Sequence, residues 1–166
     1  MVRSFVDAKA IILTLGLTEA WYHEPSQMYC NAVAGDVLAR HRDQFSFRRL
    51  GFEENYKSLQ RILDFIARTH STGDYCVFVT VSPVPLQTTF SDQDIVIANT
   101  GSKATLRAVA EEACKANKKA VYFPSYEIAM LSDAARVWRP DRLHIQKDCV
   151  RHITNVFVRR YTDRNP

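Results

Sequence analysis

Asp141 and His144 are the two side chains of this sequence best suited to acid–base chemistry, because only two residues separate them. A turn at the start of a helix can place the carboxylate against one imidazole nitrogen. That contact fixes the tautomer and leaves the other nitrogen free as a general base. The spacing alone also fits a surface histidine near a helix cap, so both interpretations stay open.

A serine nucleophile for this base is not found. Ser82 follows an apolar run, but a nucleophile elbow needs a sharp turn with small neighbours. Pro83 and Pro85 follow Ser82 instead, and they favour extended backbone. Ser125, in YFPSYEI, is expected to cap a short helix that starts at residue 126 or 127. Both serines are therefore interpreted as structural.

Gly16, Thr18 and Glu19 follow a predicted strand in the stretch TLGLTEAW and form a second group of candidate site residues. The glycine would permit a tight turn and a close backbone approach to a ligand. The threonine and the glutamate could donate or orient hydrogen bonds in a site. An ordinary strand exit, in which Thr18 caps the next element, is the alternative.

Metals and cofactors are not expected. The gaps between the four cysteines suit neither a zinc site nor a small disulfide scaffold, so free thiols in a reducing compartment are expected. The cysteines are Cys30, Cys76, Cys114 and Cys149. The histidines lack a metal-binding spacing, and no phosphate loop or dinucleotide fingerprint is present.

The composition favours a single globular domain, since 46% of residues are hydrophobic and 24% are charged. The net charge of +4 comes from basic residues interspersed with acids, so nucleic acid is not an expected partner. No apolar run is long enough to span a bilayer and no signal peptide is seen. We therefore expect a cytoplasmic protein with no membrane partner, although the true N-terminus can lie upstream of Met1.

The elements that must position these residues alternate along the chain. Unbroken apolar runs predict three strands, at 10–15, 75–81 and 119–123. Helical periodicity, for example at Leu59, Ile62, Leu63 and Ile66, predicts three helices, at 53–69, 103–117 and 146–160. This alternation predicts an α/β fold with a parallel sheet covered by helices. Residues 22–50 show no clear period and are expected to form an irregular excursion.

The predicted sheet is thin, and nothing precedes its first strand to supply a neighbour. We therefore expect upstream sequence to be missing. An unpaired apolar edge on the first strand also predicts self-association of the chain.

Five stretches together resemble the GSCFA family, in order and in rough spacing, from residue 10 to about residue 155. They are TLGLTEAW (14–21), TVSPVPL (80–86), SKATLR (102–107), YFPSYEI (122–128) and DRLH (141–144). This family is similar to SGNH hydrolases, which have a flavodoxin-like three-layer α/β/α sheet of five strands and a late Asp-x-x-His pair.

The resemblance implies that Asp141 and His144 are the acid and base of a Ser-His-Asp triad. Gly16, Thr18 and Glu19 would occupy the place of an oxyanion-binding block, with Thr and Glu replacing its Asn and Asp. Lys103 and Arg107, in the shared SKATLR stretch, are interpreted as helix-surface charges.

The Gly-Ser-Cys-Phe-Ala segment that gives the family its name is absent from residues 1–166. The chain is therefore expected to be one domain, with three of the usual five strands and without its nucleophile-bearing N-terminal segment. The resemblance implies an ester hydrolase acting on a small-molecule or glycan ester. A non-catalytic carbohydrate- or partner-binding module, and a structural α/β fragment, are the alternatives.

Overall fold

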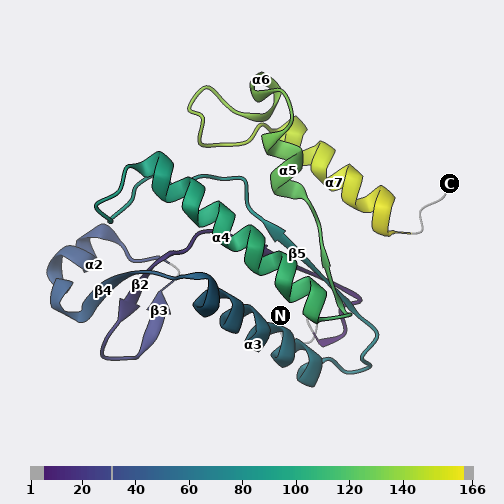
Figure 1. The fold of residues 1–166 in the computed structure, drawn as a ribbon, viewed down its shortest axis with the longest axis horizontal. Coiled ribbons are helices and arrows are strands. Elements are labelled where there is room, and N and C mark those ends of the chain that lie inside the picture. The colour runs from purple at the N-terminus through teal and green to yellow at the C-terminus, as the bar shows by residue number, and fades with distance from the viewer. Residues whose placement is uncertain (1–5, 31, 163–166) are drawn as a thin grey trace.

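A computed structural model describes residues 6–30 and 32–162 of the chain (Figure 1). Its main sheet has three parallel strands in the order β1-β5-β6. The strands are β1 (Ala10–Leu15), β5 (Cys76–Val81) and β6 (Ala120–Tyr122). The three predicted strands and their parallel arrangement are confirmed.

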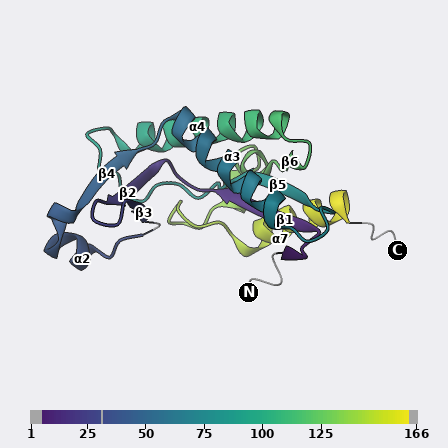
Figure 2. The same cartoon turned by 90° about the horizontal axis from the view of Figure 1, so that it is seen from below.

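Helices cover both faces of this sheet, so the predicted three-layer α/β/α arrangement is confirmed (Figure 2). One face carries α3 (Phe52–Thr69) and α4 (Ile95–Ala116), and the other carries α7 (Lys147–Tyr161). The main core lies under α3 and α4. It includes Ile11, Leu59, Leu63, Ile66, Val77, Val79, Leu106, Val109 and Ala110.

Aromatic rings form the contact between α7 and the sheet. Phe157 packs edge-on against Phe78 of β5 and Phe123, with ring centroids 4.8 and 5.2 Å apart. The first strand receives less cover, because β1 lies at the edge of the sheet and Ile12 keeps 55% of its surface exposed. Parallel sheets normally bury both faces, so β1 offers an apolar strip and, among the described residues, an unpaired edge.

The helix predicted at 103–117 begins earlier than expected, at Ile95. The carboxylate of Asp94 caps it by accepting a hydrogen bond from the backbone N–H of Val96 at 2.8 Å. The first two turns contain β-branched residues and Gly101, which weaken the helical signal of the sequence. Here the N-cap and tertiary packing outweigh intrinsic propensity.

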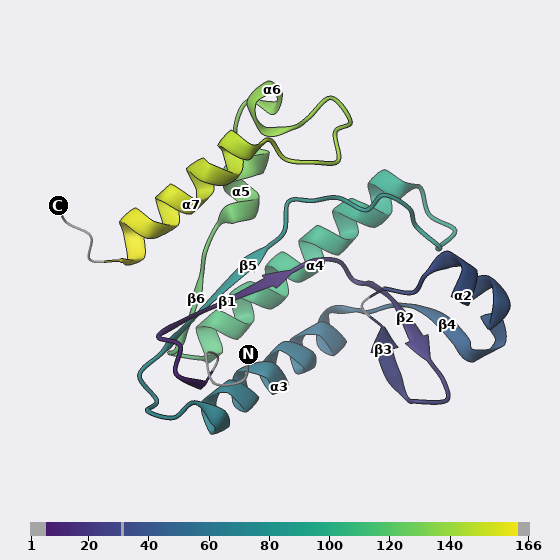
Figure 3. The ribbon, with the colours of Figure 1, turned by 180° about the vertical axis from the view of Figure 1, so that it is seen from behind.

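The irregular excursion predicted for residues 22–50 is wrong, because this region forms a second sheet. It is antiparallel, in the order β3-β2-β4. The strands of this sheet are β2 (Glu19–His23), β3 (Met28–Cys30) and β4 (Phe45–Arg49). Helix α2 (Gly35–Arg40) and the short 3-10 helix η1 (Arg42–Gln44) lie between β3 and β4 in the chain. Figure 3 shows this small sheet at the opposite end of the molecule from α7.

Two short helices connect β6 to α7. They are α5 (Ser125–Met130) and α6 (Ala134–Val137). After α6 the chain makes a loop whose ends meet in an antiparallel bridge between Trp138 and Ile145. This loop carries the Asp-x-x-His pair.

Candidate active site

The loop between Trp138 and Ile145 is held closed by its own backbone. The N–H of Arg139 donates to the carbonyl of His144 at 2.8 Å, next to the bridge that joins the loop ends. Arg142, at the tip, has φ of 57°, a left-handed conformation that is unfavourable for a side chain of this kind. Non-glycine residues hold such a conformation where the surrounding contacts impose it.

The carboxylate of Asp141 organises the interior of this loop. Its Oδ1 accepts hydrogen bonds from the backbone N–H groups of Leu143 and His144, at 2.9 and 3.0 Å. Its Oδ2 lies 2.8 Å from Nδ1 of the His144 ring. The predicted hydrogen bond between the two side chains is confirmed.

These contacts fix the charge of Asp141 and the tautomer of His144. The two backbone donors and the imidazole lower the pKa of Asp141 to about 2, so the carboxylate is ionised at neutral pH. An ionised carboxylate only accepts hydrogen bonds, so Nδ1 of neutral His144 must carry the proton. Its Nε2 then has the free lone pair that a general base needs.

His144 lines an open, largely apolar cavity of about 370 Å³. Pro83 and Val84, which follow the end of β5 by two and three residues, line this cavity together with Ile153 of α7. The site therefore lies beyond the carboxyl end of a parallel strand, where ligands of open α/β sheets bind. The histidine side chain is 55% exposed, so its ring is accessible from solvent.

Neither candidate serine is engaged by this base. Ser125 lines the cavity, but its hydroxyl lies 2.5 Å from Thr80 Oγ1 and donates to the carbonyl of Val81 at 3.1 Å. The predicted capping role of Ser125 is wrong: it is the first residue of α5, and the preceding Pro124 is the N-cap. Ser82 Oγ accepts from the N–H of Val84 at 3.2 Å, a local turn contact that agrees with a structural role. Within residues 6–30 and 32–162, no serine hydroxyl is hydrogen-bonded to His144.

The carbonyl group of Gly16 is linked through Lys103 to Val84, which lines the cavity of His144. The carbonyl oxygen of Gly16 accepts a hydrogen bond from Lys103 Nζ at 2.8 Å. A side chain at position 16 would meet open space, and the backbone there is not left-handed, so no contact within the described protein requires glycine. The close approach to a ligand and the oxyanion role of Gly16 stay predictions.

Thr18 and Glu19 lie away from His144, around two other cavities. The N–H of buried Thr18 donates to Ser102 Oγ at 2.9 Å, and β2 follows it, so the threonine caps no helix. The carboxylate of Glu19 accepts a hydrogen bond from Thr89 at 2.7 Å. These contacts connect the start of β2 to α4 and to the segment that precedes it, and the oxyanion role of both residues stays a prediction.

Lys103 is the residue near the site that the sequence interpretation missed. It was expected on the helix surface, but only 2% of its surface is exposed. Its ammonium donates to the carbonyls of Gly16 and Val84, at 2.8 and 2.7 Å. Burial lowers the pKa of Lys103 to about 8.

Arg107 is not a free surface charge either. Its guanidinium donates to Glu127 at 2.7 Å and stacks 4.1 Å from the centre of the Tyr122 ring. The tyrosine hydroxyl donates to the same carboxylate at 2.8 Å. This group ties α4, β6 and α5 together and gives Arg107 a structural role.

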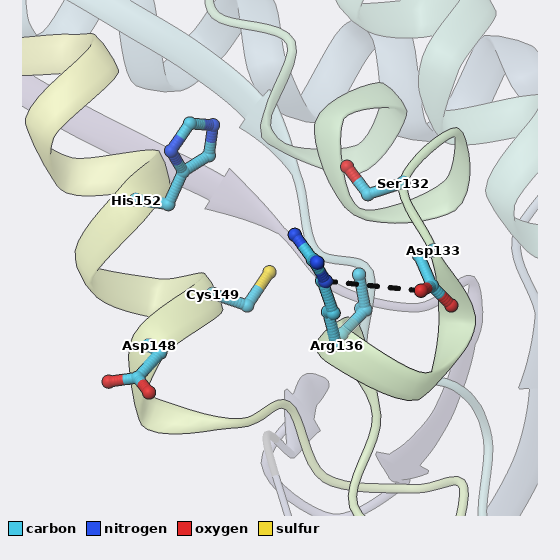
Figure 4. Close-up of a pocket in the computed structure, with 7 residues that line it drawn as sticks. Ser132, Asp133, Arg136, Asp148, Cys149 and His152 are labelled. Atoms are coloured by element: carbon cyan, nitrogen blue, oxygen red, sulfur yellow. Dashed lines mark ion pairs between the residues drawn. The ribbon is translucent and has the colours of Figure 1, made fainter.

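A second cavity, of about 390 Å³, lies between the α5–α6 connection and α7 (Figure 4). Cys149 and His152, one turn apart on α7, border it, and Arg136 faces them from α6 with an ion-pair contact to Asp133 at 4.0 Å (Figure 4). Burial raises the pKa of the Cys149 thiol, so the nucleophilic thiolate is disfavoured. The described part of the chain contains no group of three His, Cys, Asp or Glu side chains that could hold a metal ion.

Together, the fold and the site define an α/β protein with an oriented Asp–His pair beyond the end of a parallel strand. The family model described as the GSCFA family matches residues 1–157. The chain therefore belongs to the GSCFA family, as its motifs predicted. No curated protein and no solved structure matches the chain. None of the described helices is both long and apolar enough to cross a membrane.

Proposed function

We propose that this chain carries the acid and base of an SGNH-like ester hydrolase. The observation behind the proposal is the 2.8 Å contact between Asp141 Oδ2 and His144 Nδ1, in a loop whose interior the same carboxylate organises through two backbone N–H groups. An ionised acid that orients an accessible imidazole is the arrangement that activates a hydroxyl nucleophile. A histidine that merely capped a helix would not need a fixed tautomer beside a cavity.

In the proposed reaction, Nε2 of His144 accepts the proton of a serine hydroxyl as its oxygen attacks the ester carbonyl carbon. Asp141 stabilises the resulting imidazolium, which then protonates the leaving alcohol. Water, activated by the same nitrogen, hydrolyses the acyl-serine and releases the acid. The serine comes from a Gly-Ser-Cys-Phe-Ala segment of the family, supplied from outside residues 1–166.

The cavity beside His144 suits a small-molecule or glycan ester. Its volume of about 370 Å³ is within the range of small-molecule sites. Val84, Ile145 and Ile153 offer apolar surface to an acyl group. Since the cavity is open to solvent, a glycan or another alcohol could extend out of it.

Turnover of p-nitrophenyl acetate tests the proposal. Residues 1–166 alone should show no activity above background, whereas a fusion with the Gly-Ser-Cys-Phe-Ala segment of a family member should hydrolyse the ester. His144→Ala should abolish that activity. His152→Ala is the matched control, because His152 is also on this side of the sheet but borders the other cavity. A fusion without activity, or equal loss in both variants, would refute the assignment.

A further inference from the structure

Lys103 is a buried cation without an anionic partner. Only 2% of its surface is exposed, and its side-chain contacts in the described part of the chain are with two backbone carbonyls and not with a carboxylate. A lysine is almost never fully buried unless it is paired, because its ammonium loses hydration there. The hydrogen bonds to two backbone carbonyls therefore offset the free energy that the ammonium loses on dehydration, and they link Lys103 to the two segments that carry these carbonyls.

The two acceptors lie at the exits of neighbouring strands. Gly16 follows β1, and Val84 lies three residues beyond the end of β5. The strands themselves end in register, since Leu15 pairs with Val81. One more backbone hydrogen bond follows, from the N–H of Ser82 to the carbonyl of Leu15 at 2.8 Å. Beyond it, Lys103 from α4 bridges the two segments with hydrogen bonds of 2.8 and 2.7 Å.

One end of this bridge belongs to the candidate active site. Val84 lines the same cavity as His144, next to Pro83. Because proline lacks a backbone N–H, residue 83 cannot tie this segment down through a donor of its own. The hydrogen bond from Lys103 to the carbonyl of Val84 ties this part of the cavity lining to α4, and the N–H of Leu86, which donates to Asn99 Oδ1 at 3.0 Å, adds a second tie two residues later.

We propose that Lys103 is a positioning residue for the Asp141–His144 site, which holds the Pro83–Val84 wall at a fixed place relative to Gly16 at the β1 exit. The expected effect of Lys103 on turnover rests on the proposed function. The bridge itself, from Lys103 to the carbonyls of Gly16 and Val84, can be tested without it. A charged amine has three N–H groups and a neutral amine has two, so either form can serve both carbonyls. The bridge therefore persists whether or not Lys103 is protonated.

NMR spectroscopy tests the structural part on residues 1–166. In wild type, we expect through-hydrogen-bond couplings from Lys103 Nζ to the carbonyl carbons of Gly16 and Val84. Lys103→Met should shift the ring signals of His144, whereas Lys57→Met, which removes an exposed ammonium on α3, should not. Absent couplings, or His144 signals that stay unchanged in Lys103→Met, would overturn the proposal. If Lys103→Met does not fold, the wild-type couplings decide.

Kinetics of the fusion protein tests the catalytic part. A displaced cavity wall disturbs the reacting geometry, so Lys103→Met should lower kcat by about tenfold or more with little change in KM. Lys57→Met should keep wild-type values. Wild-type kcat in Lys103→Met would refute the positioning role. A fusion protein inactive even with Lys103 would refute the proposed function instead, and the NMR result would still decide whether the bridge exists.

Discussion

The buried ammonium of Lys103 should make the folded state more stable as pH rises through the alkaline range, whereas the buried thiols that titrate there should make it less stable. Its pKa falls from 10.5 to about 8 because burial removes water from the charged form. Between these two values the folded chain has released the proton while the unfolded chain still binds it. Stability rises with pH wherever the unfolded state binds more protons, so this group adds stability as pH increases above about 8.

The size of the effect follows from the two pKa values. Each pKa unit is worth about 1.4 kcal/mol, so the full difference between 10.5 and about 8 amounts to at most about 3.5 kcal/mol. Integration of the linkage relation gives almost nothing at about pH 7 and about 2 kcal/mol by about pH 9.5. Hydrogen bonds to two carbonyls favour the charged form, which makes these figures upper values.

Other groups titrate in the same range with the opposite sign. Burial raises the pKa of the Cys76, Cys114 and Cys149 thiols, so the folded chain keeps protons that the unfolded chain loses. Their contribution therefore decreases with pH. A comparison with Lys103→Met removes these terms, because both proteins share them.

Urea unfolding between about pH 7 and about pH 9.5 measures this difference, with the free energy of unfolding obtained by linear extrapolation. The stability of wild type minus that of Lys103→Met should increase steadily across this interval. Lys57→Met controls for the loss of one exposed positive charge. A wild-type curve parallel to that of Lys103→Met would show that the lysine is not desolvated, and would refute the reasoning.

Three further predictions concern the site loop, the core and the sheet edge. Asp141→Asn should speed amide exchange at the backbone N–H groups of Leu143 and His144, which donate to this carboxylate. Wild type should show the same change as pH falls from 3.8 towards about 2. The reason is that a carboxylate with a lowered pKa stabilises the fold only while it is ionised, and this stabilisation is lost as pH falls through that range. Leu63→Ala should cost about 2–5 kcal/mol of unfolding free energy because its side chain is buried, whereas Ile62→Ala, at a 44% exposed position on the same helix, should cost less than about 1 kcal/mol; equal losses by urea unfolding would contradict the packing. Ile12→Lys should weaken concentration-dependent self-association measured by sedimentation, because it places a charge on the exposed strip of the edge strand; unchanged association would exclude this edge.

The main sheet was predictable because each of its strands is a continuous apolar run. Val77, Val79 and Val81 are buried on one face of β5 and Phe78 and Thr80 on the other, which is why the strand shows no alternation of polar and apolar residues. Helix α3 was predictable for a related reason, since Leu59, Leu63 and Ile66 bury one face of it. In these elements, local pattern and tertiary environment agree.

The second sheet was not predictable in the same way. Its strands contain three to five residues, too few for a period to be recognised. The β2–β3 hairpin also lacks the usual glycine or asparagine signal, because Gln27 takes the left-handed position with φ of 55°. Pairing between β2 and β4 depends on contacts across the intervening segment, and no local propensity encodes that register.

The Asp141–His144 pair and Lys103 also differ in how far a local sequence pattern could predict their contacts. Asp141 and His144 lie three residues apart, so their contact is a property of one loop and their spacing predicts it. Lys103 reaches a carbonyl 87 residues away in the chain, and no spacing can indicate such a partner.

The burial of Lys103, however, could be predicted from its position in the helix. Lys103 precedes Leu106 by three residues and Ala110 by seven, so it lies on the apolar stripe of α4, where a charge contradicts the surrounding pattern. A side chain that breaks a local rule in this way is often functional, and this lysine is the residue through which the strand exits and the cavity of His144 are connected.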